Sequence, residues 1–287
     1  MRVLSWNIQW GRGADGVVDL NRCIETIRVL GDFDVICLQE VAQGFASLNN
    51  GRSMDGPASL VAAFPGYSAH FGAAFDGPAP SGERNRFGNL TLSRLPVGRV
   101  QVHSLPLPAE AGYAAMPRVC LEVVVADRLR ILNTHLEYYG VARRLAQAQA
   151  LHGLQLDTIQ ALRTPGETSG RIRAGTPFEP LARPASALLC GDFNCEPGSP
   201  ALAALTERDE QGTPVWVDAW EACYGTVPHL HTVGVNGAEW PDRPYCCDFI
   251  WVTPDLLGKV ESLAVDQATA ASDHQPLLLS LALDLSV

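Results

Sequence analysis

Short apolar segments rich in valine, isoleucine and leucine recur along the whole chain, and this feature restricts the possible fold most strongly. Segments of this length bounded by polar or turn residues are typical of β-strands, because helices need longer periodic patterns. Two of them are separated only by Asp127-Arg128, which predicts a β-hairpin. The chain is therefore expected to form sheets of many strands. The predicted strands cover residues 3–8, 34–40, 89–95, 118–126, 129–137, 186–193, 247–252, 260–265 and 276–283.

Helical periodicity appears between some of these strands. Apolar spacing over residues 19–30 and the alanine- and glutamine-rich stretch at 141–162 predict two helices, and Ser199-Pro200 predicts the start of a third. Many strands with few helices favour a mixed α/β fold in which two packed sheets carry helices on the outside. We expect one domain spanning residues 1–287. The predicted loops are residues 49–59, 75–86 and 164–184.

Composition and charge narrow the class of protein. The net charge of −10 argues against a protein that coats long nucleic acids by neutralising phosphates. The N-terminal sequence does not resemble a signal peptide, and no apolar run is long enough for a membrane span. The eight cysteines are therefore expected to be reduced thiols in a cytoplasmic protein, and Cys246-Cys247 lacks the paired spacing of a zinc site.

Polar side chains occur at the ends of successive predicted strands. Each has an ordinary structural explanation taken alone, such as a strand-end amide, an edge charge or a turn cap. Those separate explanations do not account for the repeated position, which predicts that four carboxylates, two amides and two imidazoles converge on one site. Clustered carboxylates repel each other unless a cation lies between them, and oxygen ligands of this kind suit Mg²⁺. These residues are Asn7, Glu40, His135, Asp192, Asn194, Asp248, Asp273 and His274.

The segment LLCGDFN ends in an acid and an amide. In LLCGDFN, Asp192 and Asn194 are two positions apart, so both side chains are expected to leave the strand on the same side. Gly191 is expected to permit a close backbone approach there. Turn chemistry explains the residues that follow, from Cys195 to Pro200, with Ser199 expected to start a helix.

Several ordered motifs resemble the endonuclease/exonuclease/phosphatase superfamily, which includes deoxyribonuclease I. The motifs span residues 5–276 and occur in the order SWNIQ, LQE, GNLTLSRLP, NTHLE, GDFNCEPGS, CDFIWV and SDHQP. The resemblance implies a four-layer α/β (α+β) sandwich, in which two mixed sheets are flanked by helices. No motif selects a subfamily.

The resemblance also implies a metal site. Glu40 would be the principal ligand of Mg²⁺, with Asn7 beside it and with Asp192 and Asp273 close to the ion. Mn²⁺ is an alternative ion. Hard oxygen ligands of these types are compatible with either.

The remaining roles implied by the resemblance concern the phosphate and water. His135, Asn194 and Arg118 would contact the phosphate, and Asp248 would orient His274 as a second imidazole. Either Asp192 or His274 could be the general base toward water. The implied catalytic residues are His135, Asp192, Asn194, Asp248 and His274.

The function implied is Mg²⁺-dependent hydrolysis of a phosphodiester, with a nuclease as the leading interpretation. The alternatives are a phosphatase or phospholipase-type esterase acting on a small phosphorylated head group, and an inactive binding module. No stable membrane association and no obligate protein partner are expected. Trp240 and Tyr245 are expected to pack in the core rather than to stack on substrate. A basic face is hinted at only by Arg84, Arg86, Arg94, Arg171 and Arg173, for which solvated loop charge is the simpler explanation.

Overall fold

The computed structural model describes residues 1–287 except 81, 113, 165–174, 180 and 286–287. The strands form two six-stranded mixed sheets with the orders β11-β12-β1-β2-β4-β3 and β5-β6-β7-β8-β10-β9. Each sheet has one parallel pair, β1–β2 in the first and β7–β8 in the second. The strands are β1 (Arg2–Asn7), β2 (Val35–Gln43), β3 (Ser68–Pro78), β4 (Arg84–Ser93), β5 (Val97–Ser104), β6 (Val119–Val125), β7 (Leu129–His135), β8 (Ala187–Asp192), β9 (Val217–Asp218), β10 (Asp248–Val252), β11 (Val260–Val265) and β12 (Leu277–Leu281).

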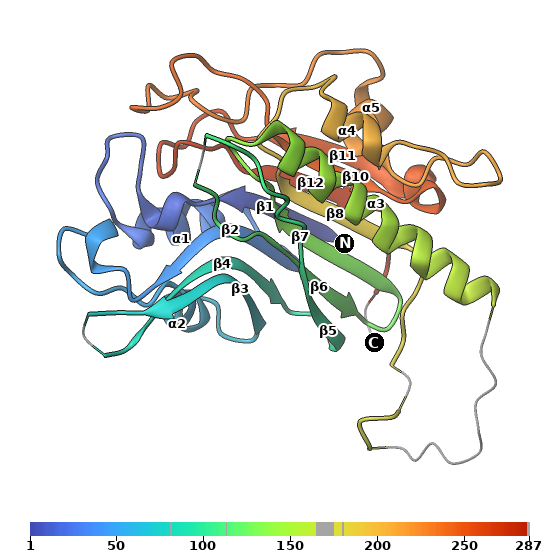
Figure 1. Cartoon of the computed structure of the whole chain (residues 1–287), viewed down its shortest axis with the longest axis horizontal. Helices are drawn as coiled ribbons and strands as arrows, with labels where there is room; N and C mark the ends of the chain where they lie inside the picture. The colour runs from blue at the N-terminus through green and yellow to red at the C-terminus, as the bar shows by residue number, and fades with distance from the viewer. Residues whose placement is uncertain (81, 113, 165–174, 180, 286–287) are drawn as a thin grey trace.

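Helices over residues 20–30, 56–63, 141–163 and 200–205 cover the outer faces of the two sheets, which gives four layers (Figure 1). A fifth helix, over residues 219–224, instead contributes Ala219 and Trp220 to the apolar cluster between the sheets. Ile27 and Leu60 belong to the apolar cluster on the outside of the first sheet, and Leu151 and Leu202 belong to that of the second. The helices are α1 (Leu20–Leu30), α2 (Gly56–Ala63), α3 (Val141–Arg163), α4 (Pro200–Leu205) and α5 (Ala219–Tyr224), with short 3₁₀ turns η1 (Gln9–Gly11), η2 (Ala46–Leu48) and η3 (Pro254–Lys259).

The predicted fold class is confirmed, as are all nine predicted strands, the hairpin of β6 and β7, and the helices α1, α3 and α4. The predicted loop at 75–86 is too long, because β3 extends to Pro78 and β4 begins at Arg84, and the one at 49–59 is too long because α2 begins at Gly56. Most of the predicted loop at 164–184 lies outside the described residues. The single-domain organisation stays a prediction. The elements not foreseen are α2, α5, β3, β5 and β9.

Buried amides connect the two sheets through hydrogen bonds in the core between them. Gln39 of β2 donates from Nε2 to Oδ1 of Asn133 in β7 at 2.8 Å, and Asn133 donates to the Leu38 and Leu90 carbonyls at 3.2 and 3.0 Å. Asn89 of β4 donates to the carbonyl of Asn133 at 3.2 Å. Because buried polar groups are costly when unpaired, these bonds hold one sheet in a defined position on the other.

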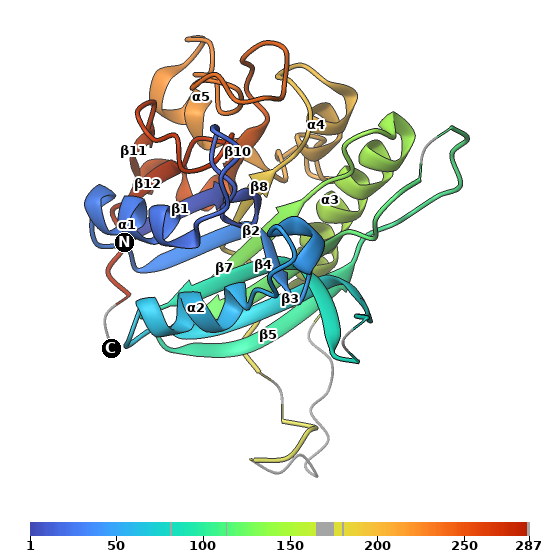
Figure 2. The same ribbon diagram turned by 90° about the vertical axis from the view of Figure 1, so that its left-hand side faces the viewer.

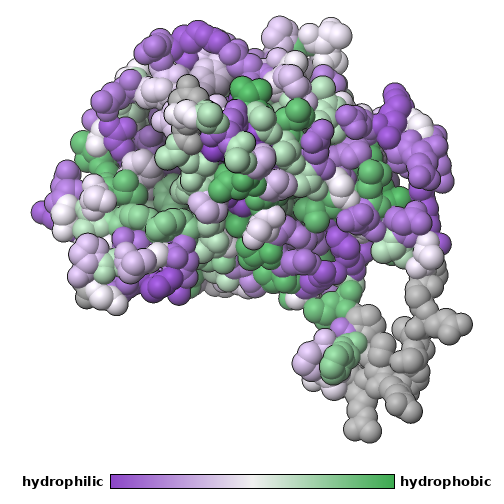
Figure 3. All heavy atoms as spheres, viewed as in Figure 1, coloured by the Kyte–Doolittle hydropathy of each residue, from purple (hydrophilic) through white to green (hydrophobic). Residues whose placement is uncertain are grey.

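The cysteines, the helices and the surface bear on the expected class of protein. All eight cysteines are free, as predicted. Among the described residues, every helix is too short or too polar to cross a bilayer. Polar and apolar side chains are interspersed on the face seen in Figure 3.

Candidate active site

The predicted site residues lie where strands of the two sheets end close together. Figure 2 shows β1, β2, β7 and β8 side by side in the middle of the molecule. In the second sheet, Asp192 at the end of β8 is paired with His135 of β7 on one side and with Asp248 of β10 on the other. The first sheet contributes Asn7 and Glu40 from β1 and β2. The parallel pairs therefore bring strand ends distant in sequence to one place.

A β-bulge aims Glu40 at the site. Leu38 pairs with Leu90 and Val41 with Gly88, so Gln39 and Glu40 together oppose the single residue Asn89 of β4. Glu40 has a φ of 58°, in the left-handed region that non-glycine residues rarely adopt. Bulges of this kind redirect a side chain, and this one turns the carboxylate away from the face that simple alternation would give it.

Gly191 allows β7 and β8 to approach closely beside the site, as predicted. Its φ is 140°, and a Cβ placed on it would lie 1.8 Å from the carbonyl oxygen of Thr134. Only glycine fits there. The close approach carries Asp192, the next residue, to within reach of both imidazoles.

Asn7 donates hydrogen bonds to one carboxylate from each sheet, Glu40 and Asp192. Its Nδ2 donates to Glu40 Oε1 at 3.1 Å and to Asp192 Oδ2 at 3.0 Å, while its Oδ1 accepts from the backbone N–H of Gln9 at 3.0 Å. The amide orientation is thereby defined. A second lone pair on Oδ1 is the part of Asn7 with which it could contact a cation.

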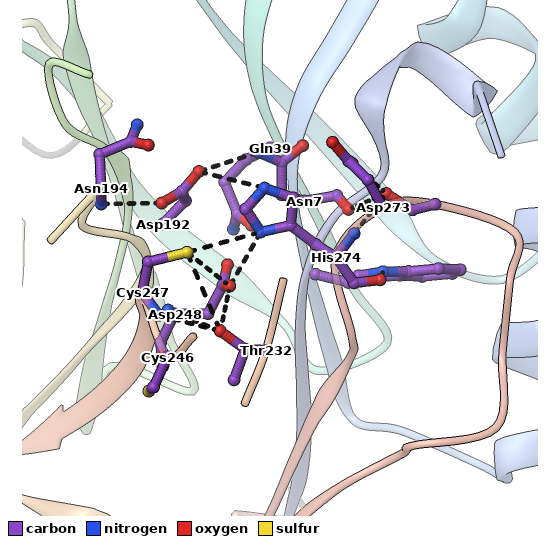
Figure 4. A network of polar contacts seen from close by, with 12 residues as sticks. Asn7, Gln39, Asp192, Asn194, Thr232, Cys246, Cys247, Asp248, Asp273 and His274 are labelled. Atoms are coloured by element: carbon purple, nitrogen blue, oxygen red, sulfur yellow. Dashed lines mark hydrogen bonds and ion pairs between the residues drawn. The ribbon is translucent and has the colours of Figure 1, made fainter. Parts of the chain in front are cut away.

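His274 is held by a carboxylate behind it, as Figure 4 shows. Its Nδ1 lies 2.9 Å from Oδ2 of Asp248, which also accepts from the Thr232 hydroxyl at 2.6 Å. The opposite nitrogen, Nε2, is 3.7 Å from Asp192 Oδ2. Burial alone would lower the pKa of His274, but Asp248, Asp192 and Asp273 together raise it well above its usual value. The ring therefore carries a proton at neutral pH.

His135 has the opposite protonation. Asn194 donates from Nδ2 to the Leu136 carbonyl at 2.9 Å, which fixes its amide, and the same Nδ2 lies 2.9 Å from His135 Nε2. That nitrogen must then accept, so the ring is neutral with its proton on Nδ1. Burial, and next the positive charge of Arg118, keep the pKa of His135 well below its usual value.

The carboxylates are unusually basic. Burial, then the charge of Asp273, raises the pKa of Glu40 to about 7, and burial raises that of Asp192 to about 6. Burial also raises the pKa of Asp273, whose oxygens accept from Gln9 Nε2 at 2.8 Å and Ser272 Oγ at 3.2 Å. Glu40, His135 and Asp192 offer ligand atoms within 4.8 Å of one another. This set of acceptors suits a hard divalent cation.

Arg118 is a buried cation beside these acids. Its side chain lines the cavity, and its Nε and Nη1 are buried without a hydrogen-bond partner. Burial lowers its pKa, while Glu40, Glu137 and Asp192 act in the opposite direction. A buried guanidinium with unpaired N–H groups can bind an anion, which is the role predicted for Arg118.

One cavity of about 270 Å³ joins these groups. Seven of the nine predicted residues line it, and the other two, Asn7 and Asp248, lie behind it and bond to those that do. All nine are thus brought together. Their roles stay predictions. The predicted residues in the lining are Glu40, Arg118, His135, Asp192, Asn194, Asp273 and His274.

Several residues of the cavity were not foreseen. Gln9 and Trp10 come from η1, and Tyr138 and Tyr139 follow His135 in the sequence. The position of YY directly after the NTHLE motif was the available signal. The expected core packing of Trp240 is wrong, because this side chain lines the cavity and is 39% exposed.

The arginines considered for a basic face lie elsewhere or are paired. Arg84 and Arg86 both form ion pairs with Asp76, and Arg94 pairs with Asp34. None of these lines the cavity. The remaining two, Arg171 and Arg173, lie outside the described residues.

The sequence and the fold are similar to those of known proteins. The model of the Endonuclease/Exonuclease/phosphatase family matches residues 4–274. An endonuclease/exonuclease/phosphatase from Beutenbergia cavernae is similar in structure, with 23% identity, a TM-score of 0.63, and coverage of 98% of this chain and 71% of that one. One from Bacteroides vulgatus has 20% identity and a TM-score of 0.65, over 99% and 98% of the chains.

A third similar structure is the 3′ phosphatase NExo from Neisseria bound to a product DNA hairpin. It has 17% identity and a TM-score of 0.59, over 98% of this chain and 99% of that one. No curated protein matches the sequence.

Proposed function

Because the chain belongs to the Endonuclease/Exonuclease/phosphatase family, we propose that it is a Mg²⁺-dependent phosphoesterase that hydrolyses phosphodiesters as a nuclease. The observation that carries this proposal is that one cavity combines clustered carboxylates with a buried arginine. Glu40, Asp192 and Asp273 place three acidic side chains in the lining, and two guanidinium nitrogens of Arg118 have no hydrogen-bond partner. A metal-bound phosphate satisfies both.

The oxygen-rich donor set and the raised carboxylate pKa values fit a divalent ion. Glu40, Asp192 and Asp273 would hold it, with Asn7 beside them. When bound, Mg²⁺ would neutralise charge on the phosphate oxygens and so act as a Lewis acid.

The chain's own groups divide the remaining work. Arg118 and His274, both cationic, would donate to the phosphate oxygens and stabilise their developing charge. A protonated His274 has no lone pair to receive another proton. Asp192, whose pKa is about 6, is therefore the group that accepts the proton of water. His135 would contact the phosphate through Nε2, which lies 3.4 Å from Asp192 Oδ2, after the phosphate displaces its contact with Asn194 and the ring proton moves to Nε2.

The cavity favours a phosphodiester over a polyphosphorylated head group. Arg118 is the sole lysine or arginine among the described residues lining it. One guanidinium suits one phosphate, whereas an inositol polyphosphate would require several cations. An inactive binding module would not need the basic carboxylates and the oriented imidazole to lie together.

Hydrolysis of bis-p-nitrophenyl phosphate tests the enzyme proposal. We expect turnover with Mg²⁺, none with EDTA, and losses of about 100-fold or more in His274→Ala and Asp192→Ala. The matched controls His231→Ala and Asp157→Ala alter exposed residues outside the cavity and should retain activity. Metal-independent or mutation-insensitive turnover would refute the proposal.

The substrate class needs a panel of abasic duplex, single-stranded DNA, poly(A), inositol polyphosphates and sphingomyelin. We expect hydrolysis of nucleic acid. Activity confined to the inositol compounds would replace the nuclease with a phosphatase.

A further inference from the structure

Three aromatic side chains form part of the cavity wall beside the phosphate-binding groups. The ring centroids of Tyr138 and Tyr139 are 4.5 Å apart, and those of Tyr138 and Trp240 are 4.9 Å apart. All three line the cavity that contains Asp192 and Arg118. We call Tyr138, Tyr139 and Trp240 the aromatic rim.

The aromatic rim leaves large ring surfaces in contact with solvent. Tyr139 is 58% exposed and Trp240 is 39% exposed, whereas Tyr138 is partly buried between them. Aromatic residues that serve only to pack a core bury most of their area. Neighbouring exposed rings at the mouth of a polar cavity indicate a binding surface instead.

The tyrosine pair is held in place by α3. Arg144 donates from Nη1 to the carbonyls of Glu137 and Tyr138 at 2.9 and 2.7 Å, and Gln147 Oε1 accepts from the Glu137 N–H at 2.8 Å. The Tyr139 N–H donates to Glu137 Oε1 at 3.1 Å. A surface whose backbone is fixed in advance loses little entropy when it binds a ligand.

The charges around the aromatic rim identify the ligand chemistry. The cavity holds three acidic side chains and one arginine, and the whole chain carries a net charge of −10. Affinity for a nucleic acid therefore cannot come from many phosphate contacts. Stacking of a base on an aromatic ring needs no positive charge and tolerates any base.

We propose that the aromatic rim binds the face of an unpaired nucleobase adjacent to the phosphate that Arg118 receives, which makes single-stranded nucleic acid or a frayed end the preferred substrate. This inference rests on the proposed function. Bases within a duplex have their faces covered by neighbouring base pairs, so they cannot use this surface. A membrane surface is the less fitting ligand, because these rings border a cavity rich in carboxylates rather than a broad apolar patch.

Binding of two probes with equal charge tests the proposal. In Asp192→Asn, chosen to prevent turnover, a thymidine octanucleotide should bind about tenfold more tightly than the same backbone made of abasic tetrahydrofuran residues. The ratio should not depend on salt, because the phosphates are equal in number. Adding Tyr139→Ala or Trp240→Ala should remove most of the preference for the thymidine probe, and Trp240→Phe should retain this preference. The control Phe178→Ala removes a ring that is more exposed, at 79%, and lies outside the cavity, and it should have no effect.

Three results would overturn the proposal. One is equal binding of the two probes, including no measurable binding of either. Another is an equal loss for both probes in the alanine variants. The third is binding to sphingomyelin vesicles that depends on Tyr139 and Trp240 without discrimination between the probes. Failure of the proposed function is separate, since it is measured by hydrolysis of bis-p-nitrophenyl phosphate with the unaltered protein.

Discussion

Replacing Glu40 by glutamine should stabilise the protein when metal is absent. The pKa of Glu40 rises from an ordinary 4.5 to about 7, mainly through burial and the charge of Asp273. The folded state therefore holds a proton that the unfolded chain has released. The stability linked to this proton is fully present below pH 4.5 and is lost as the pH rises through about 7.

The cost can be calculated from the shift. At about 1.4 kcal/mol per pKa unit, ionised Glu40 costs the metal-free protein about 3 kcal/mol near pH 8. Glutamine does not ionise, and its oxygen can still accept the 3.1 Å hydrogen bond from Asn7. The free energy of unfolding of Glu40→Gln should thus exceed that of the wild type by about 3 kcal/mol near pH 8. Near pH 4.5 the two values should be similar.

Urea denaturation in EDTA at several pH values measures the difference. Mg²⁺ should then stabilise the wild type more than Glu40→Gln, because the ion removes the repulsion that the substitution has already removed. The control Glu25→Gln changes an exposed carboxylate paired only with Arg28 and should alter stability by less than about 0.5 kcal/mol. Equal or lower stability of Glu40→Gln in EDTA near pH 8 would refute the reasoning.

Three further substitutions test other parts of the site. Arg118→Met should lower kcat/KM by about 100- to 1000-fold without lowering the free energy of unfolding, because two of its guanidinium nitrogens make no hydrogen bond. A matching loss of stability in denaturation experiments would contradict this. Asp248→Asn should lower the pKa of His274, so the alkaline fall in the pH profile of kcat/KM should move to lower pH. If the alkaline limb of that profile does not move, His274 does not act as the proposed cation. Gly191→Ala should lower the free energy of unfolding by about 3 kcal/mol or more, since its Cβ would lie 1.8 Å from a carbonyl oxygen. The control Gly198→Ala, with a φ of 83° and open space around it, should lower it by about 1 kcal/mol in the same urea titration.

The fold and the membership of the site could be predicted because both depend on local patterns. Strand periodicity is visible in single segments, and the motifs place Asn7, His135 and Asp192 at strand ends. The edge strand β5 escaped detection because its apolar positions are interrupted by Gly98, Arg99 and Gln101, and it is half exposed along its length.

The geometry of the site could not be predicted because it depends on contacts between distant segments. The bulge that aims Glu40 exists only through the pairing of β2 with β4. The missing partners of Arg118 are likewise a property of the folded cavity. Trp240 follows a long irregular segment, so nothing local distinguished a wall of the cavity from a place in the core.

The position of β12 beside β1 has a consequence for how the protein is synthesised. Within this chain β1 is made long before β12, which is one of its two sheet neighbours, and the Met1 nitrogen donates to the Leu281 carbonyl at 2.9 Å. Until the chain has been translated that far, β1 has an open edge that can pair with another chain. His274 is likewise among the last residues of the site to be made. A chain released before that point would therefore be prone to aggregation, and the residues of the candidate site could come together only after His274 and β12 have been made.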